Sequence, residues 1–387
     1  MSGALADIIV VSVEQAVAAP YASSRLADAG ARVIKVERPE GDFARNYDTL
    51  VKEQSAYFVW LNRGKESVRL DLKDSEDLHL LEQMIAKADI FIQNLKPGSI
   101  DKLGLSQAVL RQRHPRLIAC EITGFGHDGV FSHLKAYDLI VQAESGLCSI
   151  TGTPEGPARV GVSVCDIAAG MNAHAAILEA LVHRQKSGEG SSIQISLFDA
   201  MADWMNVPVL QLAYGGYETK RAGVNHPTLA PYGAYLCQDG KYVIFSIQND
   251  REWVAFCAKV LHRPELARAD GFADNMARLS NRPALDAIIK DIFAALTSTD
   301  AMEQLEAAGI AYGRLNTIAE MVSHPHARKV ELMTPGGPIS IIAPAAIIDG
   351  NKSPNFGAVP RLGEHDQKVR AEFAPASCHV EPHGPEM

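Results

Sequence analysis

An aspartate at position 166 lies in the stretch of the chain whose residue types best suit covalent chemistry. The stretch reads Gly-Val-Ser-Val-Cys-Asp-Ile-Ala-Ala-Gly from Gly161 to Gly170. Val162 and Val164 indicate the buried end of a strand. Apolar residues then recur at helical spacing at Ile167, Met171, Leu178 and Leu181. Asp166 is therefore predicted at the junction where a strand turns into a helix.

This position allows two interpretations of Asp166. In the first, its carboxylate is an N-cap that accepts a backbone N–H of the first helical turn, a contact worth about 1 kcal/mol. In the second, the junction holds the carboxylate rigidly at the mouth of a pocket, ionised by the helix dipole, where it can attack an acyl carbon. The two interpretations are compatible, and the rest of the chain must decide whether the second applies.

The elements that would position Asp166 alternate between strands and helices. Strands are predicted at Ile8–Val13, Arg32–Glu37, Ser67–Asp71, Asp89–Gln93, Leu117–Thr123 and Ile193–Leu197. Helices are predicted at Pro20–Ala29, 75–87, Ala136–Leu147 and Asp199–Tyr214. This alternation predicts an α/β fold with a doubly wound parallel sheet. The first turn reads Val17-Ala-Ala-Pro20 and lacks the GxGxxG fingerprint, so NAD binding is not supported.

Composition excludes several classes of protein. The 387 residues suffice for two or three domains, and a formal charge of −9 argues against nucleic acid or an anionic membrane as the main partner. The longest apolar run, Ile339–Ile348, contains Ser340 and Pro344 and is too short to span a bilayer. The N-terminus lacks the features of a signal peptide, which predicts a cytoplasmic enzyme without a membrane segment.

The cysteines give no sign of a disulfide framework or a metal site. They lie at positions 120, 148, 165, 237, 257 and 378, without CxxC pairing or Cys/His ligand spacing. Reduced thiols and no bound metal are therefore expected.

The character of the chain changes after residue 217. Residues 218–325 are predicted to form a smaller α+β domain, with a hairpin turn at Gln238–Lys241. The Pro- and Gly-containing segment that follows is expected to form an ordered strap up to residue 374. Residues 375–387 are expected to be a disordered tail.

Several separated blocks make the sequence similar to the class III CoA-transferases, the family that also includes the α-methylacyl-CoA racemases. The resemblance covers about residues 7 to 374. The blocks are Leu26–Pro39 with Gly41-Asp42, Asn62–Lys65, Asn94–Gly98, Gly124–Gly126, Tyr137-Asp138, Gly188–Gly190, Pro231-Tyr232 and Leu362–His365. This resemblance implies a Rossmann-like large domain, residues 1–217 completed by the strap 326–374, and a homodimer with interlocked subunits.

The resemblance also implies that Asp166 is the catalytic nucleophile. A carboxylate that attacks a CoA thioester forms a mixed anhydride and releases the CoA thiolate, which divides a difficult exchange into easier acyl transfers. Coenzyme A then enters as a substrate, and no permanently bound cofactor is expected. Residues that match the family's CoA groove are Val17, Arg38, Leu72, Asn94, Lys96, Lys102, Lys135 and Tyr137.

Two alternatives remain open. A racemase needs a histidine and an aspartate to move an α-proton, and its histidine would stand where this chain has Tyr137. Because an unperturbed tyrosine is a poor base, this substitution favours transfer of CoA. A CoA-binding protein without catalytic activity is the second alternative, and the presence of Asp166 argues against it.

The substrate is predicted from weaker signals. The segments Asn225–Pro227 and Gln248–Trp253 resemble the branch that moves CoA from succinyl-CoA to C4 or C5 dicarboxylates such as mesaconate, itaconate or citramalate. A distal carboxylate needs a cationic partner, for which Arg45, Arg221 and His226 are candidates. The run of four glycines found over the site of oxalate-type enzymes is missing.

Overall fold

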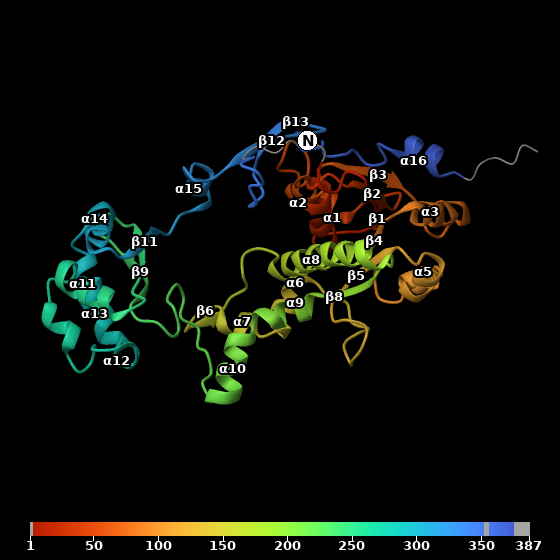
Figure 1. Ribbon diagram of the computed structural model, residues 1–387. Coiled ribbons are helices and arrows are strands. Elements are labelled where there is room, and N and C mark those ends of the chain that lie inside the picture. Colours follow the sequence, from red (N-terminus) through yellow and green to blue (C-terminus); the bar gives the residue numbers. More distant parts are fainter. Residues whose placement is uncertain (1–2, 352–355, 375–387) are drawn as a thin grey trace, which may run out of the picture. The chain divides into compact units, whose positions relative to one another are not determined.

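The computed structural model describes residues 3–351 and 356–374, so the predicted tail at 375–387, including Cys378, lies outside the described residues. The chain forms two compact units (Figure 1). Among the described residues, the first comprises 3–147, 160–207, 328–351 and 356–374, and the second comprises 148–159 and 208–327. The middle segment of the first unit ends at residue 207, ten residues before the predicted domain boundary at 217. The short segment 148–159 belongs to the second unit, although it was predicted in the large domain.

The first unit contains a six-stranded parallel sheet. Its strands are β1 (Ile9–Val13), β2 (Arg32–Glu37), β3 (Lys65–Arg69), β4 (Ile90–Gln93), β5 (Ile118–Thr123) and β8 (Ser192–Ser196). They lie in the order β3-β2-β1-β4-β5-β8, and every neighbouring pair is parallel. The predicted α/β class with a parallel sheet is thus confirmed. The chain order reverses between β1 and β4, and in such sheets ligands bind beyond the carboxyl ends of the strands at that point.

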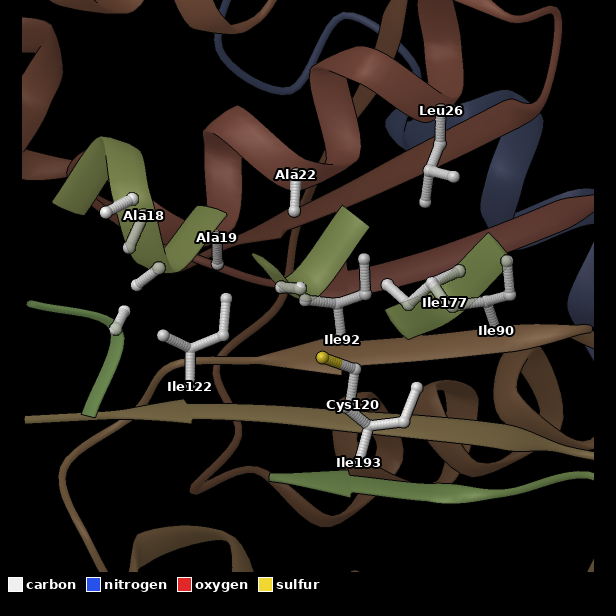
Figure 2. Close-up of a cluster of buried hydrophobic side chains, with 14 of the residues drawn as sticks. Ala18, Ala19, Ala22, Leu26, Ile90, Ile92, Cys120, Ile122, Ile177 and Ile193 are labelled. Atoms are coloured by element: carbon white, nitrogen blue, oxygen red, sulfur yellow. The ribbon is translucent and has the colours of Figure 1, made fainter. Parts of the chain in front are cut away.

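Helices cover both faces of this sheet. One face packs against α1 (Ala18–Asp28), α8 (Val164–Ser187) and α9 (Leu197–Trp204), as Figure 2 shows for part of the core. The other face packs against α3 (Ser75–Lys87), α5 (Gln107–Arg113) and α16 (Asp366–Phe373). Successive residues of a strand alternate between these cores, with Val10 in the first and Val11 in the second. Both faces are buried, which explains why the central strands β1, β4 and β5 are mostly apolar, whereas the edge strands β3 and β8 carry more polar residues.

Shorter elements complete the first unit. They are the 3₁₀ helix η1 (Phe43–Asn46), α2 (Ala56–Leu61), α4 (Ser99–Lys102), α6 (Asp138–Glu144) and the antiparallel strands β12 (Lys329–Thr334) and β13 (Gly337–Ile342). Helix α16 is fixed to the edge strand β3, because His365 accepts a hydrogen bond from Ser67 N and Asp366 accepts one from Arg69 N. Within the described residues the segment from 328 onward therefore belongs to the same unit as the parallel sheet.

Small residues line the contact between α1 and α8. Ala18, Ala19 and Ala22 face Ala169 and Ala173 in one buried cluster. A Cβ atom at Gly170 would lie 2.6 Å from the carbonyl oxygen of Ala18 and 2.8 Å from Cβ of Tyr21, so only glycine permits this approach. Close packing of these two helices sets the position of the first turn of α8, which contains Asp166.

Replacing Gly170 with alanine is expected to separate α1 from α8. Overpacking of this kind costs about 1–3 kcal/mol of unfolding free energy. The CoA transfer that the family resemblance implies should also fall, because the first turn of α8 moves with its helix. Urea unfolding and initial rates measure the two effects. Gly215→Ala is the matched control, since a Cβ added at that helical glycine would meet no heavy atom within 4 Å. Equal effects of the two substitutions would contradict this account.

Helix α8 is also, within residues 3–351 and 356–374, the one helix long and apolar enough to cross a membrane by length and composition. Core packing explains this composition, because Ala169, Ala173 and Ile177 are fully buried against α1 and the sheet.

The second unit contains a three-stranded antiparallel sheet, β9 (Tyr232–Leu236), β10 (Tyr242–Ser246) and β11 (Ala311–Arg314). The predicted hairpin is present, since Leu236 pairs with Tyr242 across the turn. Its helices are α11 (Asp250–Lys259), η2 (Pro264–Arg268), α12 (Asn275–Ser280), α13 (Arg282–Phe293), α14 (Ser298–Ala308) and α15 (Ile318–Val322). The core is rich in aromatic rings, with Phe245 packed against Phe256 and Phe293.

Three predicted elements differ from the structure. Residues 158–163, all of which the structure describes, form no strand leading into α8: Val162 is 55% exposed, and its carbonyl accepts a hydrogen bond from Val164 N in a tight turn. The helix predicted at Ala136–Leu147 breaks at Gly146, which has φ 82°, into α6 and α7 (Leu147–Ile150). The helix predicted at Asp199–Tyr214 is divided into α9 and α10 (Asn206–Gly215), because Pro208 has no N–H to donate to Trp204.

Candidate functional site

A cavity of about 400 Å³ lies beyond the carboxyl ends of β1 to β4. Its walls are formed by residues that follow these four strands: Val13–Gln15, Val36–Arg38 with Gly41-Asp42, Leu70–Lys73, and Leu95, Ser99, Lys102 and Leu103. This is the position at which a doubly wound sheet binds its ligands, because the strand order reverses between β1 and β4.

Three of the predicted CoA-groove residues line this one cavity. They are Arg38 after β2, Leu72 after β3 and Lys102 at the end of α4, and Lys73 joins them. The side chains of Arg38 and Lys102 are exposed, and Arg38 Nε donates to the carbonyl of Gly41 at 3.2 Å. A cavity with several cations and an apolar leucine suits a molecule that carries both phosphates and an aromatic base.

The other predicted groove residues lie elsewhere. Asn94 and Lys96 flank Leu95, which lines the cavity, but neither of them lines it. Val17 is buried at the N-cap of α1, so its side chain is not available to a ligand. Lys135 and Tyr137 are exposed and precede α6, outside the cavity wall.

Asp166 is the third residue of α8, and the N-cap of that helix is Ser163. The prediction that Asp166 itself is the N-cap was therefore wrong, because the turn at Val162 starts the helix earlier. Its side chain is half-buried. Within the described part of the chain, burial and the charge of Asp138 act on its carboxylate, and no hydrogen bond or ion pair engages it. Burial, followed by the charge of Asp138, raises the pKa of Asp166 to about 7. These effects outweigh the helix dipole, which was expected to keep the group ionised.

Asp138 acts on Asp166 through its charge, a role that the sequence analysis did not predict for it. It is the buried first residue of α6, and its Oδ1 accepts the backbone N–H of Cys165 at 2.8 Å. Its Oδ2 accepts a hydrogen bond of 2.6 Å from Gln142 Nε2. Asp138 thus fixes the first turn of α8 one residue before Asp166. The Tyr137-Asp138 block was visible in the sequence, but the contact across 27 positions was not.

Tyr47 interacts electrostatically with Asp166 and with Asp42, a residue that lines the cavity. Burial and the nearby charges of Asp42 and Asp166 raise the pKa of Tyr47 to about 12, with smaller effects from Tyr137 and Tyr57. The rings of Tyr47 and Tyr57 meet edge to face at 5.5 Å. Asp166 is not a lining residue of the cavity, whereas Asp42 is. The negative charges of both carboxylates therefore disfavour the ionised form of Tyr47.

The pKa of Asp166 gives a testable pH dependence. In the attack on a CoA thioester that the family resemblance implies, only the ionised form of Asp166 is a nucleophile, so kcat/KM should rise about tenfold per pH unit below 7 and become constant above it. Asp138→Asn removes one cause of the raised pKa and should move this limb to lower pH. Initial rates between about pH 5 and 9 test both expectations. A limb that stays in place in the variant would contradict the role assigned to the charge of Asp138.

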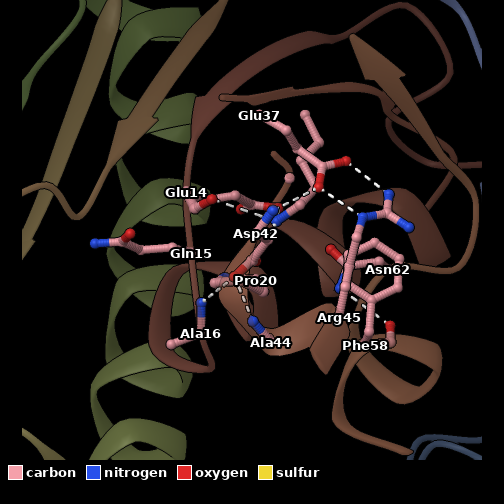
Figure 3. Close-up of polar contacts among 12 residues, drawn as sticks. Glu14, Gln15, Ala16, Pro20, Glu37, Asp42, Ala44, Arg45, Phe58 and Asn62 are labelled. Carbon is pink, nitrogen blue, oxygen red and sulfur yellow. Dashed lines mark hydrogen bonds and ion pairs between the residues drawn. The ribbon is translucent and has the colours of Figure 1, made fainter. Parts of the chain in front are cut away.

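A buried ionic cluster supports the wall of the cavity (Figure 3). Lys35 Nζ lies 2.8 Å from Asp42 Oδ2, and Lys65 Nζ lies 2.7 Å from Glu14 Oε1. All four of these side chains are fully buried. Such pairs persist away from water only when further hydrogen bonds satisfy each charge, as Ser12 and Ser23 do for Glu14.

Arg45, predicted as a substrate ligand, belongs to this supporting structure instead. Its guanidinium donates to both carboxylate oxygens of Glu37 at 2.7 and 2.8 Å and lies 3.7 Å from the ring centre of Phe58. Burial alone would raise the pKa of Glu37, but the hydrogen bond from Arg45 and the charge of Lys35 lower it to about 2. A guanidinium held in this way is not free to bind a substrate carboxylate.

The other two substrate candidates lie in the second unit. Arg221 donates to the carbonyl oxygens of Thr153 and Ser149, and His226 stacks on Tyr232 with ring centres 5.2 Å apart. His127 of the first unit, a residue close to the Tyr137 block, pairs with Glu121 at 3.1 Å. The structure gives each of these residues a local partner.

Comparison with known proteins assigns these features to a family. Residues 5–366 match the family described as CoA-transferase family III. The chain is 34% identical over 376 residues to an acetyl-CoA:oxalate CoA-transferase of Acetobacter aceti, covering 96% of each chain. It is also 34% identical over 387 residues to a succinyl-CoA:mesaconate CoA-transferase of Haloarcula hispanica, again covering 96% of each. Among solved structures, a CaiB/BaiF family protein from Brucella suis aligns with a TM-score of 0.82 at 34% identity, covering 96% of this chain and 100% of that one.

Proposed function

Because this chain belongs to CoA-transferase family III, we propose that it moves CoA from succinyl-CoA to a C4 or C5 dicarboxylate with Asp166 as the nucleophile. The observation that carries the proposal is a half-buried carboxylate that, within the described residues, has no protein partner in the first turn of α8. A structural aspartate at this position would cap a backbone N–H, as Asp138 does for Cys165. Asp166 is left available for chemistry.

The bonds that form and break in the proposed exchange involve only this carboxylate and the two substrates. Asp166 attacks the thioester carbonyl and forms an acyl anhydride, while the C–S bond breaks and CoA leaves as a thiolate. The thiolate attacks the Asp166 carbonyl of the anhydride, which gives an aspartyl-CoA thioester and free succinate. The acceptor carboxylate then attacks the aspartyl-CoA thioester, which forms a second anhydride and releases the CoA thiolate. The thiolate attacks the acceptor's acyl carbon in this anhydride, so the acceptor's CoA thioester and the free carboxylate of Asp166 are the products.

The cavity beyond β1 to β4 is the proposed CoA site. Arg38, Lys73 and Lys102 would pair with phosphate groups, and Leu72 would contact the adenine. Lys96, Lys135 and Tyr137 remain predicted contacts from the family resemblance. Since α1 packs closely on α8 and follows the turn that forms one wall of this cavity, the pantetheine arm would run from the cavity toward α8.

The acceptor class is inferred from the relatives, whose names specify oxalate and mesaconate. Both acids are dicarboxylates, and a second carboxylate needs a cation or a set of N–H donors in the site. Arg45 is paired to Glu37, and Arg221 and His226, which have local contacts within the second unit, stay as predicted cationic partners from the sequence.

A substrate screen tests this proposal. The enzyme is mixed with succinyl-CoA and a panel of acids from oxalate to glutarate, including mesaconate, itaconate and citramalate. We expect the acceptor's CoA thioester and an equal amount of succinate by mass spectrometry, together with an acylated Asp166 peptide after rapid quenching. Exchange of an α-proton with solvent, without transfer to any acid, would instead indicate the racemase activity. Binding of CoA without either reaction would indicate a binding protein.

We also propose that two copies of the chain form the active enzyme, interlocked as in the family. Helix α8 exposes Met171, Leu178 and Val182, which recur along one side of the helix, and Trp204 of α9 is 53% exposed. Apolar residues in such a row are typical of surfaces that a partner covers. Light scattering coupled to size exclusion should give twice the chain mass of 41.8 kDa, and a monomer that is fully active would contradict the proposal.

A further inference from the structure

The turn that joins β1 to α1 is formed without the glycines usual at this position of a doubly wound sheet. It comprises Glu14, Gln15, Ala16 and Val17. Ala16 has φ 63°, in the left-handed region that residues with a Cβ rarely adopt. Since Glu14 and Gln15 line the cavity, this strained turn forms part of its wall. Other groups must hold the turn in this conformation.

Side chains from three separate segments of the chain form hydrogen bonds with successive backbone groups of the turn. Lys35 Nζ of β2 donates to the carbonyl of Glu14 at 3.3 Å. The Asn94 carboxamide accepts from Gln15 N and donates to Gln15 O, both at 2.9 Å. Asp42 Oδ1 accepts from Ala16 N at 3.1 Å. Three consecutive residues are thus fixed by side chains distant in sequence.

These holding groups are themselves fixed. Asp42 also accepts the N–H of Ala44 at 2.9 Å, and its second oxygen pairs with the buried ammonium of Lys35. Asn94 follows β4 directly, and β4 is the neighbour of β1 on the other side of the point where the strand order reverses. The two residues therefore join the turn to the strands on both sides of β1.

We propose that Asn94 and Asp42 are positioning residues that form the CoA-facing turn before the ligand arrives. Asn94 acts through the backbone of Gln15, because its side-chain nitrogen and oxygen are both engaged there, and not as a direct contact to CoA. Figure 3 shows the side chain of Gln15 directed away from the ionic cluster, and Gln15 is itself a lining residue of the cavity. This inference rests on the proposed function only in taking a CoA thioester as the ligand of the cavity.

Hydrogen exchange of the wild-type enzyme tests whether the turn is formed in advance. In the free enzyme the amides of Gln15 and Ala16 should exchange on the order of 10³ times more slowly than unstructured amides, and addition of CoA should change this little. Exchange at the unstructured rate in the free enzyme, with protection only after CoA is added, would overturn the proposal. This measurement requires neither a variant nor transferase activity.

Variants then separate positioning from direct contact. Asn94→Ala and Asp42→Asn should each raise the dissociation constant for desulfo-CoA about tenfold, equivalent to about 1.4 kcal/mol, and speed exchange at Gln15 in the free enzyme. A weaker affinity with unchanged exchange would make Asn94 a direct ligand and overturn the proposal. If transfer activity is never found but both shifts occur, the positioning role stands and only the proposed reaction fails.

Asp89→Asn is the matched control for these variants. Asp89 also accepts a backbone N–H of β1, from Ile9 at 2.9 Å, and pairs with Arg184 at 3.0 Å, but it does so at the opposite end of the strand. We expect this substitution to lower stability while leaving desulfo-CoA affinity and the exchange of Gln15 unchanged. An equal loss of affinity would show that any weakening of β1 suffices, and would also overturn the proposal.

Discussion

Asp166→Asn is expected to lower the rate of CoA transfer by at least about 10³-fold while the protein remains folded. An amide cannot attack the thioester, and removal of a covalent nucleophile costs activity on this scale. The acylated peptide should vanish from quenched reactions of the variant. Binding of desulfo-CoA should persist, because Asp166 does not line the cavity that we assign to CoA.

Stability distinguishes a chemical loss from a folding defect. The pKa of Asp166 is raised in the folded state to about 7 from an ordinary value of 3.8, so the folded protein loses stability as pH rises between these values. Replacement by a neutral amide removes this penalty, and Asp166→Asn should unfold at higher urea concentration than the wild type at about pH 8. A less stable variant would contradict this assignment.

Asp199→Asn provides the matched control for position. Asp199 is also the third residue of a helix, α9, but its backbone N–H and one carboxylate oxygen both bond to the N-cap Ser196. Its role is structural, and the substitution should leave transfer within about twofold while costing about 1 kcal/mol at most. Loss of activity in both variants would contradict the proposal that Asp166 is catalytic and Asp199 structural.

Glu14→Ala should be among the most destabilising single substitutions in the first unit. It leaves the fully buried ammonium of Lys65 without its carboxylate and deprives Ser12 and Ser23 of their acceptor. Breaking a buried pair in this way costs about 3–5 kcal/mol. Urea unfolding measures the loss, which approaches a large part of the stability of an ordinary domain.

The surface pair of Lys368 and Glu66 serves as the control for Glu14. Its nitrogen and oxygen are 2.6 Å apart, but Lys368 is 58% exposed, so Lys368→Ala should cost less than about 1 kcal/mol. Burial alone would raise the pKa of Glu14, yet Lys65 and Lys35 outweigh it and hold the pKa below its usual value of 4.5. The stabilisation is therefore present at neutral pH and is lost only in strong acid. Equal costs for the two variants would contradict the role given to burial.

The sequence predicted the layered fold because strands buried on both faces leave continuous apolar runs between helical patterns. The resemblance to the family, and not the strand pattern, placed Arg38, Leu72 and Lys102 in one groove, and the structure brings all three to one cavity. Parallel neighbouring strands explain this result, since the residues that follow each strand meet at the same edge of the sheet.

Contacts between distant side chains could not be predicted in the same way. No local pattern pairs Asp138 with the N–H of Cys165, or Arg45 with Glu37 in preference to a substrate. The strand predicted before Asp166 failed for a related reason, because Val162 and Val164 are apolar but, among the described residues, no neighbouring strand is placed to pair with them. Local pattern specifies the type of an element, whereas its partners depend on the tertiary structure.

The close contact between α1 and α8, which is lined by alanine and glycine, limits how the substrate specificity of such an enzyme could change. Because a Cβ atom at Gly170 would lie 2.6 Å from the carbonyl oxygen of Ala18, no side chain can be added there without separating the two helices and displacing the proposed nucleophile. New specificity would have to arise in loops that surround Asp166, such as the one that carries Tyr47, while the distance from helix to helix stays constant. The position of the proposed nucleophile can then stay constant while the loops that select the acid change.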